Sequence, residues 1–116
     1  MSKYKIFHNP RCSKSRQTLQ ILKEHDCEVE VILYLETAID ESVLVDILMK
    51  MSLSPRDLLR KGEQGFKDNN LKNSNYSDQE IIKFMIQHPK LIERPIVLKG
   101  DKAILGRPPE NVLELI

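Results

Sequence analysis

Cysteine is scarce in this chain of 116 residues, which contains only Cys12 and Cys27. The amino end carries no export signal, so two cysteines do not predict a disulfide-stabilised secreted fold, and we expect the protein to act in the reducing cytoplasm. Long hydrophobic runs are missing as well, because no apolar stretch approaches the ~18 residues that a bilayer requires. The sequence therefore predicts a protein without a membrane-spanning segment.

An excess of charge of one sign is also absent. The chain has 18 lysines and arginines against 17 acidic residues, a formal net charge of +1. Such a balance gives no general attraction to nucleic acid or to a membrane surface, so any anion binding has to come from basic residues that gather locally. A chain of this length is expected to form one domain, residues 1–116, and we expect a monomer.

Alternating apolar and turn residues predict an α/β domain. Lys3–Phe7 and Val29–Tyr34 resemble strands on either side of a helix over residues 13–26, an order that favours a parallel pair. Near the other end, Ile96–Leu98 and Ala103–Leu105 predict a hairpin around a Gly-Asp turn, and a last helix is expected over Glu110–Leu115.

The middle of the chain is rich in helix signals. A helix is expected over Glu41–Met51 with Asp40 as its N-cap, and a short helix is expected from Pro55 to Arg60 with Ser54 as its N-cap. A loop over residues 61–76, with a helical turn around Phe66, leads to a helix that begins at a Ser77–Glu80 capping box and ends at Pro89. The whole order predicts a thioredoxin-like (glutaredoxin-like) four-stranded mixed sheet with a helical insertion over about residues 38–90.

Cys12 occupies the junction between the first strand and the first helix. Asn9-Pro10 predicts the turn that ends the strand, so the thiol meets the unpaired N–H groups and the positive dipole end of the helix. Lowering a thiol pKa by two units requires about 2.7 kcal/mol, whereas a helix end typically supplies ~0.3–1 kcal/mol. Other groups must therefore contribute, and the candidates are His8, Arg11, Lys14 and Arg16.

Spacing excludes several familiar uses of such a thiol. Ser15 stands where a Cys-x-x-Cys pair would place its second cysteine, and Thr18 stands where a cysteine phosphatase would have arginine. A zinc site is not expected, because the available histidines and cysteines fall at opposite ends of one helix. Cys27 is expected to be a packing residue. The site is thus a single thiol, and any redox cycle needs a second thiol from outside the chain.

Three further arginines fall at the ends of predicted elements. Arg60 ends the short middle helix, Arg94 precedes Pro95, and Arg107 precedes the Pro108-Pro109 pair. Taken singly, each is expected to be an ordinary surface charge. Together, in a thiol domain, they could form planar forks that bind a tetrahedral oxyanion.

With these residues the chain resembles the glutaredoxin-linked arsenate reductase family over essentially its whole length. The similarity rests on five segments of the sequence: 8–16 (HNPRCSKSR), 33–36 (LYLE), 58–61 (LLRK), 94–97 (RPIV) and 107–108 (RP). Two features depart from the longer members, namely the absence of their C-terminal tail and a more basic active-site loop containing Arg11 and Lys14. The chain is most similar to a shorter subgroup.

The resemblance implies a catalytic role for Cys12 as nucleophile and for His8 as the histidine that supports the thiolate. It implies oxyanion binding by Arg60, Arg94 and Arg107, a supporting turn containing Ser15 and Arg16, and Pro95 as the cis-proline of thioredoxin-like folds. The implied activity is reduction of arsenate to arsenite with glutathione as co-substrate and glutaredoxin as partner, with no bound cofactor and no metal.

Two other functions remain open at this point. A monothiol glutaredoxin-like oxidoreductase acting on glutathionylated substrates fits the Cys12-x-x-Ser15 spacing, but it needs a glutathione groove rather than three arginines. A redox-responsive regulator that binds RNA polymerase is a more distant alternative, since such relatives usually carry Cys-x-x-Cys at this turn.

Overall fold

The computed structural model describes residues 3–72 and 75–116 of the chain. The chain divides into two compact units. The first unit comprises Met1–Thr37 and Arg94–Ile116, and the second unit comprises Ala38–Glu93. Cys12 therefore belongs to the first unit and Arg60 to the second.

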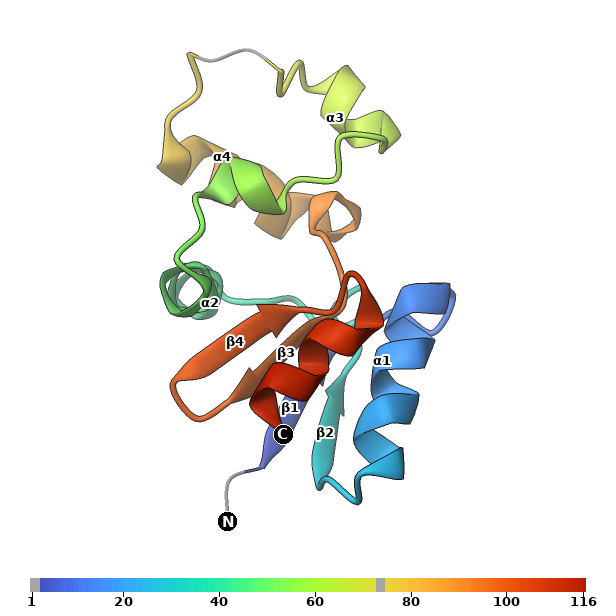
Figure 1. Ribbon diagram of the computed structural model, residues 1–116. Helices are drawn as coiled ribbons and strands as arrows, with labels where there is room; N and C mark the ends of the chain where they lie inside the picture. The colour runs from blue at the N-terminus through green and yellow to red at the C-terminus, as the bar shows by residue number, and fades with distance from the viewer. Residues whose placement is uncertain (1–2, 73–74) are drawn as a thin grey trace. The chain divides into compact units, whose positions relative to one another are not determined.

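A four-stranded mixed sheet forms the centre of the first unit (Figure 1). Strand β1 pairs in parallel with β2 and antiparallel with β3, and β3 forms an antiparallel hairpin with β4, giving the order β2-β1-β3-β4. The α/β class and the thioredoxin-like sheet predicted from the sequence are thus confirmed. The bounds of the strands are Tyr4–Phe7 for β1, Val29–Ile32 for β2, Ile96–Lys99 for β3 and Lys102–Leu105 for β4.

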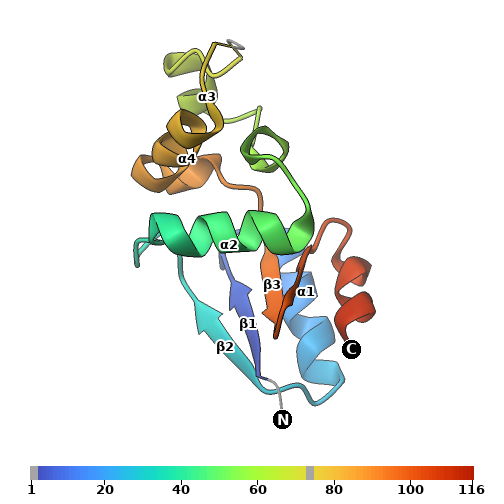
Figure 2. The same cartoon turned by 90° about the vertical axis from the view of Figure 1, so that its left-hand side faces the viewer.

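Two helices, α1 (Ser13–Glu24) and η3 (Pro109–Leu115), lie side by side on one face of this sheet (Figures 1 and 2). Side chains alternate between the two faces of a strand, so Tyr4 and Ile6 of β1 both point toward these helices. They form a buried core with Leu22 of α1 and with residues of β3 and η3, and the Tyr4 hydroxyl donates to the Leu115 carbonyl at 3.0 Å. The remaining members of this core are Val97, Val112 and Leu115.

Three predicted elements of the first unit differ from the structure by more than one residue at an end or in helix type. Helix α1 ends two residues early because Asp26 takes a left-handed conformation, φ 56°, which an α-helix cannot contain. Strand β2 stops at Ile32 rather than Tyr34, because the amides of Glu36 and Thr37 both donate to the Leu33 carbonyl and turn the chain. The last helix is of the tighter 3₁₀ type.

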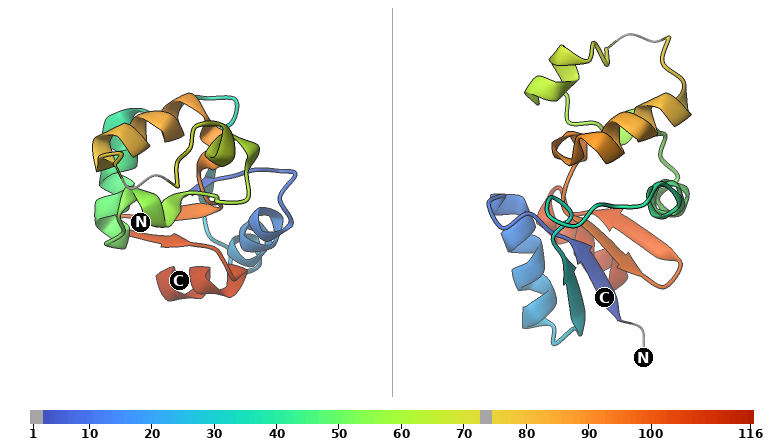
Figure 3. Two further views of the ribbon diagram at one scale, coloured as in Figure 1. Left: turned by 90° about the horizontal axis from the view of Figure 1, so that it is seen from above. Right: turned by 180° about the vertical axis from the view of Figure 1, so that it is seen from behind.

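The second unit is built from α2 (Glu41–Met51), η1 (Pro55–Leu58), α3 (Gln64–Asp68), α4 (Asp78–Gln87) and η2 (Pro89–Leu91) (Figure 3). Helix α4 packs against α2, η1 and η2. The predicted capping box is present, with the Glu80 amide donating to the Ser77 hydroxyl at 3.2 Å.

The short helix of the second unit ends at Leu58 instead of Arg60, because Leu59 pairs with Ile92 in an isolated antiparallel bridge. The predicted helical turn around Phe66 is α3, and residues 73 and 74 of the predicted loop lie outside the described residues. Within those described residues no helix is both long and apolar enough to cross a membrane.

Candidate functional site

Cys12 is the N-cap residue of α1 and is 8% exposed. Its amide donates to the Asn9 carbonyl at 2.9 Å, and its own carbonyl accepts from the Arg16 amide at 3.0 Å, so the thiol sits on the last bend before the helix. The Asn9 side chain accepts from the Arg11 amide at 3.0 Å and tightens the same bend. The sulfur therefore lies at the end of α1 where the helix dipole favours an anion.

Behind this turn, His8 and Ser15 form a buried hydrogen bond. The His8 Nδ1 atom is 2.6 Å from the Ser15 hydroxyl oxygen, which also accepts from the Asn9 amide at 3.1 Å. Burial lowers the pKa of His8 below its usual value, and the charges of Lys23 and Arg16 lower it further. A histidine with a lowered pKa is mainly neutral at pH 7, so one ring nitrogen carries a proton and the other can accept a hydrogen bond.

This protonation state bears on the expected role of His8. A neutral imidazole supports a thiolate by donating a hydrogen bond, whereas an imidazolium would do so through its charge. The residue that shares its hydrogen bond, Ser15, is fully buried. Ser15 thus stabilises the turn through its hydrogen bonds, and it occupies the place where a Cys-x-x-Cys pair would have its second cysteine.

Arg16 is tied to the same turn through its side chain. Its Nη1 donates to the Pro10 carbonyl at 2.8 Å. The guanidinium therefore connects the second turn of α1 to the loop that leads into Cys12. Because this hydrogen bond holds the guanidinium against a backbone oxygen, Arg16 stabilises the turn.

Arg94 and Arg107 come together in the first unit. Arg107 donates from Nη1 to the Arg94 carbonyl at 3.4 Å, and both arginines precede cis-prolines, Pro95 and Pro108. The cis bond at Pro95 is the one that the family resemblance implies; the bond at Pro108 is a second one that the sequence did not point to. Between the two arginine loops, the Gly106 amide donates to the Pro95 carbonyl at 2.8 Å.

The Arg94 guanidinium is the most unusual polar group of this unit. Its Nε and Nη1 atoms are buried, and no acceptor among the described residues lies within hydrogen-bond distance of either. Leaving charged donors buried and unpaired is costly, and the cost disappears when an anion supplies the acceptors. Each of these two atoms could therefore donate to an acceptor atom of an anion placed beside it.

Gly106 holds the arginine loops close to α1. A Cβ atom at this position would lie 2.5 Å from the Thr18 hydroxyl oxygen and 2.8 Å from Cγ of Pro95. Thr18 belongs to the helix that Cys12 begins, and its hydroxyl is bonded to the Lys14 carbonyl at 2.8 Å. The loop that carries Arg107 is therefore packed directly on α1.

Arg60 belongs to the second unit and is engaged there. Its guanidinium forms ion pairs with Glu63 at 3.1 Å and with Glu93 at 3.4 Å, and its amide donates to the Leu91 carbonyl at 2.7 Å. The two glutamates were not anticipated, although the three-residue spacing of Arg60 and Glu63 is one at which side chains on a turn meet. A role for Arg60 beside Cys12 stays a prediction.

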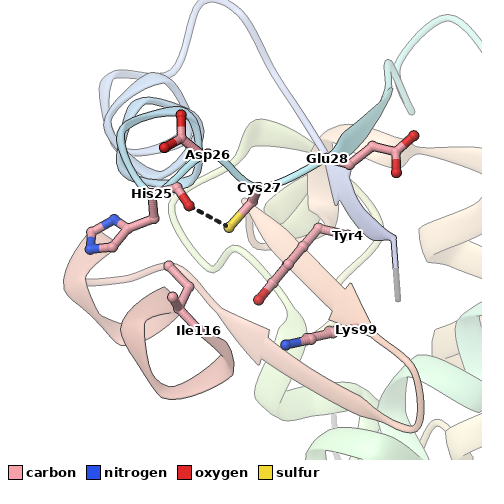
Figure 4. A pocket seen from close by; sticks show the side chains of 7 residues that line it. All are labelled: Tyr4, His25, Asp26, Cys27, Glu28, Lys99 and Ile116. Carbon is pink, nitrogen blue, oxygen red and sulfur yellow. Dashed lines mark hydrogen bonds between the residues drawn. The ribbon is translucent and has the colours of Figure 1, made fainter. Parts of the chain in front are cut away.

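Cys27 lines a separate cavity of about 470 Å³ in the first unit (Figure 4). Its thiol points toward the His25 carbonyl, at 3.9 Å, and its side chain packs against the hydrophobic core, as expected of a packing residue. Lys99 closes the opposite side and donates to the Leu115 carbonyl at 3.1 Å. In the part of the chain that the structure describes, no three His, Cys, Asp or Glu side chains are grouped to hold a metal ion.

The first unit has a mixed sheet, a cysteine at the start of its first helix and a cis-proline before β3. These features define a thioredoxin-like domain with a single thiol at its turn. Comparison with known proteins agrees: the sequence model of the ArsC family matches residues 7–115. The chain belongs to the ArsC family.

Several relatives of known name are similar over nearly their whole length. An arsenate reductase of Neisseria meningitidis is 45% identical, with 97% of each chain covered. An uncharacterised Escherichia coli protein, YfgD, is 51% identical, with 97% of this chain and 95% of that protein covered. The solved structure of an arsenate reductase from Vibrio cholerae superposes with a TM-score of 0.96 at 42% identity, covering 99% of this chain and 98% of that one.

Proposed function

We propose that this protein is an oxidoreductase that reduces arsenate to arsenite, with Cys12 as its nucleophile. The observation that carries the proposal is the pair of buried nitrogen atoms on Arg94, in the same unit as Cys12, that have no hydrogen-bond partner among the described residues. They are suited to an oxyanion that a thiolate attacks. The names of the relatives from Neisseria meningitidis and Vibrio cholerae support arsenate as that oxyanion.

In the proposed first step the Cys12 thiolate attacks As(V). A sulfur–arsenic bond forms, and one arsenate oxygen leaves as water after protonation. Arg94 and Arg107 stabilise the oxyanion and the charge that the thiolate brings to it. His8, neutral and donating through its free ring N–H, stabilises the thiolate before attack.

The second step requires an external thiol, because Ser15 replaces a resolving cysteine. Glutathione attacks the Cys12 sulfur; the new disulfide forms as the sulfur–arsenic bond breaks, and its electron pair reduces As(V) to As(III), released as arsenite. Glutaredoxin then takes the glutathionyl group and regenerates the Cys12 thiol. We propose that the protein acts in this way as a cytoplasmic monomer.

The test is arsenite formation in the presence of glutathione and glutaredoxin. We expect Cys12→Ser to abolish it and the matched variant Cys27→Ser to retain it, because Cys27 lies in the separate cavity. Turnover that persists in Cys12→Ser would overturn the mechanism.

The alternatives have outcomes of their own. Turnover of a glutathione mixed disulfide without any turnover of arsenate would favour the monothiol glutaredoxin-like function. Stoichiometric capture of RNA polymerase, with neither activity, would favour a regulator.

A further inference from the structure

Two exposed cations flank the nucleophile. Arg11 and Lys14 lie on either side of Cys12, and both are exposed. Neither joins any of the ion pairs found among the described residues. Arg16 and Arg60 differ from them, because the first is bonded to the Pro10 carbonyl and the second to two glutamates.

Lys14 lies in the first turn of α1, where the other long helices of this protein have acidic residues. Helix α2 has Glu41 in its first turn and α4 has Asp78 and Glu80, whereas the first turn of α1 has no acidic residue. Acidic side chains stabilise the positive end of a helix, and a cation there does not. A lysine in this turn therefore does not serve the stability of the helix.

The surroundings add positive charge rather than cancel it. From His8 to Lys23 the sequence has no acidic residue, and the pKa of His8 is lowered first by burial and then by the charges of Lys23 and Arg16. Glu36, which follows β2 at the same end of the sheet, is exposed and forms none of the observed ion pairs. The segment around Cys12 is therefore locally basic on a chain with a net charge of only +1.

Two kinds of anion reach Cys12 in the proposed reaction. The oxyanion is suited to arginines with buried planar forks, such as Arg94. The reductant arrives later and from solvent, and glutathione carries two carboxylates on either side of its thiol. Arg11 and Lys14 have long, flexible and exposed side chains, one before and one after Cys12. Their positive charges therefore match the two carboxylates on either side of the glutathione thiol.

We propose that Arg11 and Lys14 bind the carboxylates of glutathione and so select the anionic thiol that attacks Cys12. This inference rests on the proposed function for the identity of the reductant. It makes Arg11 and Lys14 specificity-determining residues for the second substrate, distinct from the arginines that bind the first.

A thiol exchange that needs no arsenate tests this inference. In a Cys27→Ser background, Cys12 attacks one sulfur of a disulfide; a mixed disulfide forms, and the other half leaves as a thiolate, reduced as Cys12 is oxidised. The measurement is the ratio of the second-order rate constants for glutathione disulfide and for neutral 2-hydroxyethyl disulfide. The neutral reagent reports changes in the thiol itself, so the ratio isolates recognition of the carboxylates.

We expect the double variant Arg11→Gln/Lys14→Gln to lower this ratio by about three- to tenfold, the range for two exposed ion pairs. High salt should lower the ratio of the parent protein and leave that of the double variant nearly unchanged. The matched control is Lys102→Gln, which removes an exposed cation from β4 in the same unit and should not change the ratio.

A ratio unchanged in the double variant, or lowered equally by Lys102→Gln, would overturn the inference. The proposed function fails separately: it is wrong if the parent protein forms no arsenite, whatever the exchange ratio. A protein that reduces arsenate but does not discriminate between the two disulfides would overturn this inference alone.

Discussion

The Nδ1 atom of His8 lies 2.6 Å from the hydroxyl oxygen of Ser15, and both side chains are buried behind the turn that carries Cys12. The same hydroxyl oxygen accepts from the Asn9 amide. One serine therefore connects the end of β1, the turn and the first turn of α1. Loss of the Ser15 hydroxyl is therefore expected to lower the stability of the fold, apart from any effect on catalysis.

The first prediction concerns Ser15→Ala. The change leaves the Asn9 amide and His8 Nδ1 without partners, and each unsatisfied buried group costs about 1–3 kcal/mol. We expect the free energy of unfolding, measured with urea, to fall by at least about 1 kcal/mol. Ser13→Ala, at an exposed position of the same helix, is the control and should stay within about 0.5 kcal/mol of the parent. Equal urea midpoints for the two variants would contradict the prediction.

The second prediction concerns pH and follows from the lowered pKa of His8. Between the usual value, ~6.5, and the lower folded-state value, the unfolded chain binds more protons than the folded one, so stability decreases as the pH falls through this window. We expect urea unfolding curves from pH 7.5 to 5 to show this loss, and His8→Gln to show less of it. The same slope in both proteins would assign the loss to other groups.

The third prediction separates binding from folding at Arg94. Lysine lacks the planar set of donors that arginine has, so Arg94→Lys should lower kcat/KM for arsenate by about ten- to a hundredfold. Stability should not fall, because the Nε and Nη1 atoms that are removed have no acceptor among the described residues. Steady-state kinetics and urea unfolding of one preparation check both parts. A large loss of stability would mean that the guanidinium is needed for the fold.

The fourth prediction concerns the close approach at Gly106. A methyl group there meets the Thr18 hydroxyl and the Pro95 ring, and overpacking of this kind typically costs about 1–3 kcal/mol. We expect Gly106→Ala to lower the thermal midpoint, and Thr18→Ala in the same chain to restore part of the loss. Gly62→Ala is the matched control, since nothing lies within 4 Å of its Cβ position. Equal effects at the two glycines would contradict the proposed packing.

Local patterns were sufficient to predict most elements of this fold and the position of Cys12. The capping box at Ser77 and the strand–helix–strand start depend on neighbours in sequence, which propensities describe well. The predicted end of β2 was wrong because Leu33 and Tyr34 favour strands. The turn depends instead on the amides of residues 36 and 37, which donate to the Leu33 carbonyl.

Contacts between distant residues could not be predicted in the same way. The ion pair of Arg60 with Glu93 joins residues far apart in sequence, and the contact of Gly106 with Thr18 depends on how a loop packs on a helix. The three arginines could be recognised as candidates by residue type. Only the structure shows that Arg60 is already paired and that Arg94 has buried donors with no acceptor among the described residues.

The enclosure of position 15 has a kinetic consequence. A thiol placed there would be enclosed by the turn, and Cys27 lies beyond the far end of α1, a helix of 12 residues that spans about 18 Å. A disulfide needs its two Cα atoms within about 7 Å, so Cys12 has no partner within its own chain. Every disulfide at Cys12 is then intermolecular, and its rate of formation depends on the concentration of the other molecule. The rate of disulfide formation at Cys12 thus depends on the concentration of thiols and disulfides around the protein as much as on its own residues.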